Sequence, residues 1–504
     1  MYRNVPRRDP VRDGYEGILR RHAVREAAAR TYARALPIVP VRARGLTVEG
    51  ADGRRYLDCA SGAGALVLGH NHPVVLESIR SVLDSGAPLH AYDLATPVRD
   101  AFVTELLRTL PPGLADHARV RFCGPAGTDA VEAALQLVRD ATGLTDHTGL
   151  TDRTARTEIL AFAGGQRGVT TVACQASGDA VEGELCSPWA EFALDAPEFG
   201  LPNPKPAGVL LEPVQSDGGV IPVPDDWMRR IRHTTATHSI PLIVDETETG
   251  VGRTGAFWAV QHSGVIPDVM VLSKAIGGSL PLSVIVHRDD LDIHQPDAHV
   301  GEFRANQLAM AAGTATLTYV RENDLAGRAA DIGARMLSQL GRSVGEFACV
   351  GDVRGRGLMI GVEFVGGEGT GTGAGSGAGA GEAEGAWAVA GMEAMTKCQG
   401  AFVDRAVESQ HKPRSAPTRA AELAAAVQQE CLRRGLIVEL TGHHANVVRL
   451  LPPLTITDEQ AGAVLDRLYD AVEAVARGQT GGSGTGSGVG GGSGRAGRAD
   501  RRFD

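Results

Sequence analysis

Between about residues 90 and 330, short uninterrupted apolar runs alternate with amphipathic stretches. The apolar runs include VRFCG, VLLEP, LIVDE and VMVLS, and the stretches between them include DAVEAALQLVRD and WMRRIRHTTATH. A strand that is apolar throughout is buried on both faces, and such strands alternating with helical patterns indicate βαβ units. The pattern predicts an α/β domain over residues 91–330, with a mainly parallel sheet sandwiched by helices.

After residue 330 the pattern changes to α+β, with helical stretches such as AELAAAVQQECLRRG beside strands such as LMIGVEF. We therefore predict a smaller C-terminal domain over residues 331–477. We also predict that an N-terminal segment over residues 1–90 packs with this smaller domain. Residues 366–386 and 478–504 are rich in Gly with Ser and Ala. Because such segments bury too little apolar surface to offset their ordering entropy, we expect a flexible insertion and a disordered tail.

Composition narrows the class of protein. The net charge of -10 and the pI of about 5.9 argue against a nucleic-acid partner. No apolar run is long enough to span a bilayer, and the N-terminus lacks the apolar region of a secretory signal. The seven cysteines include no C-x-x-C pair, which predicts reduced thiols in the cytoplasm.

Two pairs of histidines resemble metal ligands by residue type. His70 and His72 stand in GHNHP, which is typical of a turn, and His443 and His444 are adjacent. Adjacent residues of a strand point to opposite faces, so the second pair is poorly arranged for one metal ion. We therefore expect no metal site.

Ionisable residues stand at the ends of three predicted strands. Glu212 follows VLL, Asp245 follows LIV, and Lys274 follows VMVLS. Ligands of open parallel sheets bind outside the carboxyl ends of the strands, so we expect these side chains to converge on one pocket. Simpler roles remain for two of them, since Asp245 could cap a helix and Glu212 could be a solvated carboxylate. A buried ammonium without a partner is costly, which favours a functional role for Lys274.

The segment VRFCGPAGTDAVEAALQLV predicts a strand, a tight loop and a helix. Gly127 and Thr128 fall at the first turn of this helix, where free backbone N–H groups and the helix dipole favour a phosphate. The alternative is an ordinary N-cap, because Thr before Asp is common there.

Together these groups suit pyridoxal 5'-phosphate. This cofactor requires a lysine amine to form an imine with its aldehyde, a carboxylate paired with its pyridine nitrogen, and a phosphate cradle. Lys274, Asp245 and the Gly127–Thr128 turn provide one of each.

Five segments in order resemble the class III (omega) aminotransferases, which have the pyridoxal-phosphate-dependent fold type I. They are GPAGTDAVEAAL, LEPVQSDGGVIPVPDDW, DETETGVGRTGAF, SKAIGGSLPLS and FRANQLAMAAGT. The stretches LDCASGAGALVLGHNHP and RRGLIVELTGHHANVVRLLPPLTIT resemble the diaminobutyrate–2-oxoglutarate aminotransferase branch. Outside the insertions, the resemblance extends from about residue 35 to 475.

The resemblance implies an enzyme that acts on a small amino acid and a 2-oxo acid, as a homodimer with active sites at the subunit interface. It implies that Lys274 is the imine lysine and proton carrier, and that Asp245 pairs with the pyridine nitrogen. It also implies that Arg449 faces the substrate carboxylate, and that Glu212 pairs with Arg449 when the substrate has an amine there. From the residues alone, the alternative for Arg449 is a surface salt bridge.

Three positions around the expected cofactor depart from the family. Gln166, followed by Arg167, stands where the family has an aromatic residue that stacks on the cofactor ring. Glu248 replaces a Gln that bonds the phenolic oxygen, and Glu302 replaces a Thr that reaches the phosphate across the dimer interface. A carboxylate beside a phenolate or a phosphate is unfavourable unless one of the two is neutralised.

These observations support competing hypotheses. The first is an active aminotransferase that moves an amino group from a diamino acid, such as 2,4-diaminobutyrate, to or from a 2-oxo acid such as 2-oxoglutarate. The second is a catalytically degenerate homologue that serves as a scaffold or partner subunit, and a third is another pyridoxal-phosphate chemistry such as an aminomutase. Lys274 favours the first hypothesis, and the acidic replacements favour the second.

Overall fold

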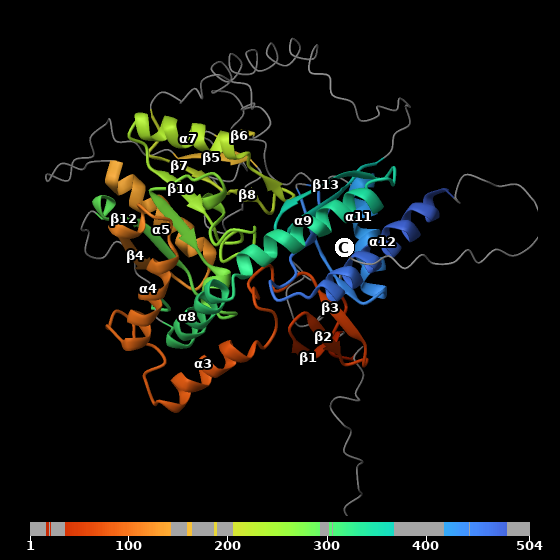
Figure 1. The fold of residues 1–504 in the computed structure, drawn as a ribbon, viewed down its shortest axis with the longest axis horizontal. Coiled ribbons are helices and arrows are strands. Elements are labelled where there is room, and N and C mark those ends of the chain that lie inside the picture. Colours follow the sequence, from red (N-terminus) through yellow and green to blue (C-terminus); the bar gives the residue numbers. More distant parts are fainter. Residues whose placement is uncertain are drawn as a thin grey trace, which may run out of the picture.

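We analysed a computed structural model of the chain. It describes residues 17–19, 21, 36–142, 159–163, 186–188, 205–292, 302–304, 306–366, 418–442 and 444–480. Gln166 and Arg167 lie outside the described residues, as do nearly all residues of the two Gly-rich stretches. Figure 1 shows a large sheet with its helices on one side of the molecule and smaller sheets with α11 and α12 on the other.

The large sheet has seven strands in the order β4-β12-β11-β10-β7-β5-β6. The strands are β4 (Ala118–Phe122), β5 (Ile159–Ala163), β6 (Cys186–Pro188), β7 (Gly208–Leu211), β10 (Leu242–Asp245), β11 (Val269–Leu272) and β12 (Val284–Arg288). Neighbours from β11 to β6 are parallel, whereas β12 is antiparallel to both β11 and β4. The predicted mainly parallel sheet is confirmed, with β12 as its antiparallel member.

Helices cover both faces of this sheet because its strands are apolar on both sides. In β10, Leu242 and Val244 join one core and Ile243 joins another. The first core also contains residues of α4, α7 and α8, and the second contains residues of α5. The helices are α4 (Pro97–Thr109), α5 (Gly127–Thr142), α7 (Asp225–Thr237) and α8 (Gln307–Glu322).

Two four-stranded sheets lie beside the large one. The first has the order β1-β2-β3-β15, and its strands are β1 (Pro40–Arg44), β2 (Thr47–Gly50), β3 (Arg55–Asp58) and β15 (Leu436–Ile437). The second is antiparallel in the order β13-β14-β17-β16, and its strands are β13 (Val350–Arg356), β14 (Met359–Phe364), β16 (Glu439–Thr441) and β17 (Val447–Leu450). Parallel pairing of β3 with β15 ties the N-terminal segment to the C-terminal part of the chain. The domain boundaries themselves stay predictions.

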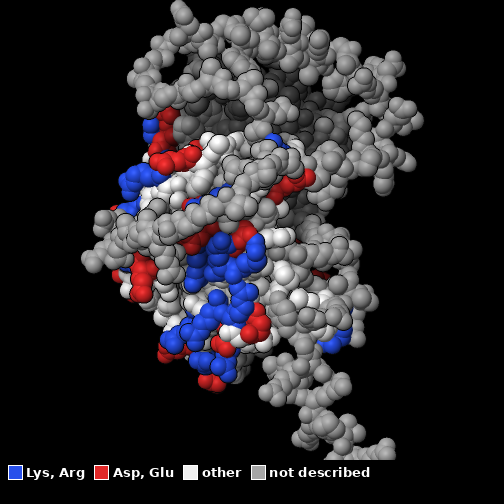
Figure 2. All heavy atoms as spheres, turned by 90° about the vertical axis from the view of Figure 1, so that its right-hand side faces the viewer, with Lys and Arg blue, Asp and Glu red and all other residues white. Residues whose placement is uncertain are grey.

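The remaining elements complete these layers. They are α3 (Pro73–Asp84), α9 (Leu325–Ser343), α11 (Arg419–Arg433), α12 (Asp458–Thr480), the β8 (Val214–Gln215) and β9 (Ile221–Pro222) ribbon, and the 3-10 segments η1 (Ala115–His117), η2 (Ala259–His262), η3 (Lys274–Gly277) and η4 (Asp289–Leu291). Among the described helices, none is long and apolar enough to cross a membrane. On the face that lies to the right in Figure 1, Lys and Arg side chains form a group with Asp and Glu side chains around it (Figure 2).

Candidate active site

The predicted site residues of the large sheet lie at one edge, the one formed by the carboxyl ends of its parallel strands. Asp245 is the last residue of β10, and Lys274 comes two residues after the end of β11. The two strands are parallel, with Asp245 opposite Val271. The α5 helix begins at the same edge, because a Cβ built on Gly127 would lie 3.2 Å from Thr247 Cγ2 and 3.5 Å from Ser273 Cβ. The tertiary structure therefore brings Lys274, Asp245 and the α5 N-terminus together.

Lys274 occupies a strained backbone position. Its φ of 52° lies in the left-handed region, which costs a non-glycine residue about 1–2 kcal/mol and is concentrated at functional sites. From there its Nζ donates to the Ala63 carbonyl oxygen at 3.1 Å and forms an ion pair with Glu248 Oε1. The turn thus aims the amine away from the sheet and toward residues of other segments.

Asp245 is a buried carboxylate beside this amine. Its Oδ1 accepts a hydrogen bond from the Thr247 backbone N–H at 2.8 Å. Burial raises the pKa of Asp245, and hydrogen bonding from Thr247 and the positive charge of Lys274 act in the opposite direction. Such a buried acid is suited to a cationic partner, as the pyridine nitrogen of pyridoxal phosphate would be.

Gly127 provides close approach at the start of α5. Because the Cβ contacts at Gly127 would already be tight, a larger side chain would crowd the gap between the ends of β10 and β11. The helix has 16 residues, so its first backbone N–H groups and its dipole favour an anion. This edge of the sheet thus offers an amine, a buried acid and the N-terminus of a helix that favours an anion. These groups fit the three requirements of pyridoxal phosphate.

Arg449 reaches this edge from the second small sheet. It is 5% exposed and lies on β17, directly opposite Glu439 of β16. Its Nη2 donates to Glu439 Oε2 at 2.8 Å and its Nη1 to Glu248 Oε2 at 2.9 Å. Burial lowers the pKa of Arg449, but the charges of Glu248, Glu439 and Asp217 outweigh it and raise the pKa above its ordinary value.

Glu248 connects the two cations. One carboxylate oxygen contacts Lys274 Nζ, and the other accepts hydrogen bonds from Arg449 Nη1 and the Ser216 hydroxyl. Burial alone would raise the pKa of Glu248, but the charges of Arg449 and Lys274 dominate and lower it to about 2. The carboxylate is therefore ionised and balanced by two positive charges, a compensation that the sequence pattern did not reveal.

Glu212 directly follows β7, whose last residue pairs with Val244 of β10, so it lies at the same edge as Asp245. Glu212 is half-buried and its Oε2 accepts from the Ser216 backbone N–H at 3.2 Å, whereas the carboxylates on Arg449 are Glu248, Glu439 and Asp217. Glu302 is exposed on the surface, beside Phe303.

His70, one of the histidines that resemble metal ligands, contacts a carboxylate. His70 Nε2 contacts Asp58 Oδ2 at 2.7 Å, and Asp58 Oδ1 also caps the backbone of Ala60. Within the described residues, no group of three or more His, Cys, Asp or Glu side chains is arranged to hold a metal ion. The His70 contact indicates a local structural role.

Sequence reasoning missed Glu439, Asp217 and Ser216. Glu439 interrupts the apolar run LIVEL, and a charge in a buried strand requires a partner, so this signal was available. Asp217 and Ser216 lie in the motif LEPVQSDGG, where nothing in the pattern distinguishes them as neighbours of Arg449.

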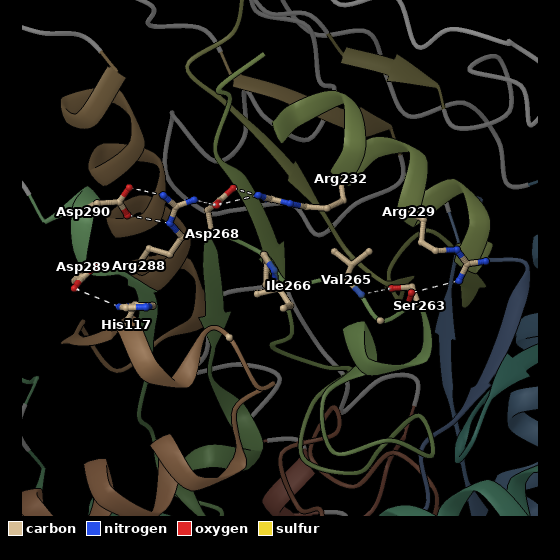
Figure 3. A pocket seen from close by; sticks show the side chains of 13 residues that line it. His117, Arg229, Arg232, Ser263, Val265, Ile266, Asp268, Arg288, Asp289 and Asp290 are labelled. Atoms are coloured by element: carbon tan, nitrogen blue, oxygen red, sulfur yellow. Dashed lines mark hydrogen bonds and ion pairs between the residues drawn. The ribbon is translucent and has the colours of Figure 1, made fainter. Parts of the chain in front are cut away.

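A separate hollow of about 640 Å³ lies at the opposite end of the strands (Figure 3). At its centre Asp268 precedes β11 and accepts from the Leu242 backbone N–H at the start of β10. Arg232 and Arg288 both pair with Asp268, and Arg229 donates to the Ser263 carbonyl oxygen. The charges of Arg232 and Arg288 are compensated by Asp268, and the hollow lies at the opposite ends of the strands from Lys274, so we place it outside the catalytic edge.

Comparisons with known proteins identify the family of the chain. The family model of class III aminotransferases matches residues 27–196 and 201–472. A diaminobutyrate–2-oxoglutarate aminotransferase of Rhizobium meliloti is 41% identical, over 91% of this chain and 93% of the relative. The corresponding enzyme of Haemophilus influenzae is 36% identical, over 90% and 94%.

A solved ornithine aminotransferase of Toxoplasma gondii, described with pyridoxal phosphate at its active site, shares the fold. Its TM-score is 0.70 and its identity is 23%, over 92% of this chain and 96% of that chain. The chain belongs to the class III aminotransferases and is a pyridoxal-phosphate-dependent aminotransferase of fold type I.

Proposed function

We propose that this aminotransferase moves an amino group between the distal amine of a diamino acid, of the 2,4-diaminobutyrate type, and a 2-oxo acid such as 2-oxoglutarate. The names of the relatives at 41% and 36% identity support this choice of substrates. The observation that carries it is the chain of contacts from Lys274 through Glu248 to Arg449, which places a buried guanidinium one carboxylate away from the reactive amine.

The proposal assigns a chemical role to Lys274, to Asp245 and to the start of α5. Pyridoxal phosphate, when bound, supplies an aldehyde and an electron-accepting ring. Lys274 holds the cofactor and its Nζ carries a proton to and from the substrate carbon that bears the nitrogen. Asp245 keeps the pyridine nitrogen protonated, and the start of α5 at Gly127 and Thr128 binds the phosphate.

Arg449 accounts for recognition of the oxo acid. A guanidinium binds a carboxylate through two parallel hydrogen bonds. A 2-oxo acid has its carboxylate next to the reacting carbon, which matches the short span from Lys274 to Arg449 that Glu248 bridges. We infer that the carboxylate of the oxo acid takes the place of Glu248 on Arg449.

The contacts of Glu248 also bear on the alternative of a non-catalytic scaffold. That alternative depended on acidic residues repelling the cofactor. Arg449 pairs with Glu248 independently of Lys274, so a charged Glu248 is compatible with an active site in which Lys274 holds the cofactor. Glu302 lies on the surface, so in the proposed dimer it would act at the active site of the partner subunit.

The proposal includes a homodimer, which an exposed apolar surface supports. Phe303 is 71% exposed, Leu94 69% and Leu89 50%. They lie on two neighbouring segments, which are joined by a bridge between His90 and Asn306. A contiguous exposed apolar patch of this kind marks an interaction site. A second copy of the chain would cover it and bring Glu302 toward the partner site, as the family resemblance implies.

We also place the enzyme in the cytoplasm. Four cysteines among the described residues, Cys59, Cys123, Cys349 and Cys431, are buried free thiols. Unpaired buried thiols are compatible with a reducing compartment, which supports this placement.

An assay of the overall amino-group transfer tests the proposed substrates. Purified enzyme with pyridoxal phosphate should form glutamate from 2,4-diaminobutyrate and 2-oxoglutarate. Because lysine cannot reproduce the bidentate contact, Arg449→Lys should raise the KM for 2-oxoglutarate at least tenfold. Arg335→Lys, which alters an exposed pair with Asp458, is the control and should leave KM unchanged. Turnover restricted to amines without a carboxylate, with Arg449→Lys silent, would contradict the proposal.

A further inference from the structure

Arg253 is a buried cation that joins the catalytic edge to the second small sheet. It is 1% exposed and lies in the loop that follows β10 and also carries Glu248. Its Nη1 donates to the Leu358 carbonyl oxygen at 3.2 Å and to the Pro452 carbonyl oxygen. The Leu358 N–H donates to the Arg253 carbonyl oxygen at 2.9 Å. Both the side chain and the backbone of Arg253 therefore hold this loop against the sheet.

The two carbonyl groups belong to the strand pair that carries Arg449. β14 and β17 are antiparallel neighbours, with Gly361 opposite Arg449. Leu358 directly precedes β14, and Pro452 follows β17 by two residues. Continuing the register places both carbonyl groups at the same end of the strand pair, which is the end nearer to Arg449. A single guanidinium nitrogen thus fixes the part of β17 from which Arg449 extends.

Close packing on both sides of Arg253 leaves the loop and the sheet little freedom. A Cβ built on Gly357, where φ is 58°, would lie 2.4 Å from the Thr254 carbonyl carbon and 2.7 Å from the Arg253 carbonyl oxygen. A Cβ built on Gly252 would lie 2.9 Å from Leu454 Cδ1. A displacement of Arg253 would therefore be passed directly to the segments that flank β14 and β17.

The charge of Arg253 is more than a structural link requires. Both acceptors are neutral carbonyls, and in the part of the chain that the structure describes its Nε and Nη2 have no hydrogen-bond partner. A buried cation held by neutral groups is costly, and a neutral side chain could donate similar hydrogen bonds. Burial lowers the pKa of Arg253 to about 10, and the charge of Glu248 opposes this effect. The side chain is therefore positive at neutral pH and lies within the electrostatic influence of the site.

We propose that Arg253 is a positioning residue, which holds β17 against the loop of Glu248 and so sets the span between Arg449 and Lys274 that a 2-oxo acid requires. This inference rests on the proposed function, in which the carboxylate of the oxo acid binds Arg449. A misplacement of about 1 Å by a change far from the reacting atoms can cost about a hundredfold in rate. Arg253 thus affects recognition of the oxo acid without contacting it.

The test compares two amino acceptors, with 2,4-diaminobutyrate as the donor. Succinate semialdehyde has the structure of 2-oxoglutarate without the carboxylate next to the reacting carbonyl. In Arg253→Met, KM for 2-oxoglutarate should rise about tenfold more than KM for succinate semialdehyde, and kcat should change by less than about threefold. If succinate semialdehyde is turned over too slowly, its competitive inhibition constant replaces its KM. Arg328→Met removes a guanidinium that donates to the Ile456 carbonyl oxygen at 2.6 Å, farther along the same segment, and as the matched control should leave KM unchanged.

A double-mutant cycle shows whether Arg253 acts through Arg449. In the Arg449→Lys background, Arg253→Met should raise KM for 2-oxoglutarate by less than about threefold, because the group that it positions is already lost. Arg253→Lys retains the charge and N–H donors at a shorter reach, so it should give the same acceptor preference with a smaller change, about threefold. This variant carries the test if Arg253→Met does not fold.

Equal losses with both acceptors, additive effects in the cycle, or an equal loss in Arg328→Met would overturn the role of Arg253 while the proposed function stands. If Arg253→Met does not fold, a wild-type KM for 2-oxoglutarate in Arg253→Lys would overturn it as well. Absence of activity with 2-oxoglutarate in the wild type, or a silent Arg449→Lys, would instead refute the proposed function, and this inference with it.

Discussion

Replacing Glu248 by Gln should destabilise the cofactor-free enzyme. The substitution keeps the size of the side chain and removes the charge that bridges Lys274 and Arg449. Both cations then lose a buried partner, although Arg449 retains Glu439. Loss of one member of a buried ion pair is costly because the remaining charge stays desolvated.

The magnitude follows from the pKa of Glu248, which folding lowers from its ordinary value of 4.5 to about 2. At roughly 1.4 kcal/mol per pKa unit, the ionised carboxylate contributes about 3 kcal/mol of stability, an order-of-magnitude figure. Since the folded-state pKa is depressed, this contribution is complete above pH 4.5 and is lost as the pH falls toward 2. Glu248→Gln should therefore lower stability at pH 7, and the difference from wild type should shrink below pH 4.5.

Thermal unfolding followed by circular dichroism at pH 7, 5.5 and 4 measures this effect, with protein concentration held constant because a dimer is expected. We expect Tm to fall by several degrees at pH 7. Glu473→Gln removes an exposed helical pair with Arg477 and should cost less than about 1 kcal/mol. A Glu248→Gln variant as stable as Glu473→Gln, or a difference that grows as the pH falls, would refute the reasoning.

Two further predictions concern the cofactor and the dimer. Borohydride treatment of the enzyme with pyridoxal phosphate should fix the cofactor on the peptide that contains Lys274, and Lys274→Ala should lose the visible absorption band while keeping its circular dichroism spectrum; mass spectrometry that finds the label on another lysine would contradict the assignment. Phe303→Asp places a charge in the exposed apolar surface and should shift the enzyme from dimer to monomer in sedimentation equilibrium, whereas Val365→Asp, also at an exposed apolar residue, should not; an unchanged dimer in Phe303→Asp would show that this surface lies outside the interface.

Much of the fold was predictable from local patterns. The strands that contain LIVD and VMVL are apolar throughout, so burial on both faces and a parallel arrangement followed from their composition. Strand ends that carry Asp245 and Lys274 indicated the edge where a ligand binds. The antiparallel direction of β12 was not predictable in this way, because an apolar run does not encode the direction of its neighbours.

The sequence by itself determined which chemical groups are available: an amine and a carboxylate at strand ends, a glycine at a helix start, and a family likeness carried by ordered motifs. Only the tertiary structure decided how their charges are shared. Glu248 was predicted to lie beside the phenolic oxygen of the cofactor, and in the structure it contacts both Lys274 and Arg449, the latter 201 residues away along the chain. Because the pKa of a buried carboxylate depends on which charges surround it in space, no local pattern could have shown that Glu248 is held ionised by two cations.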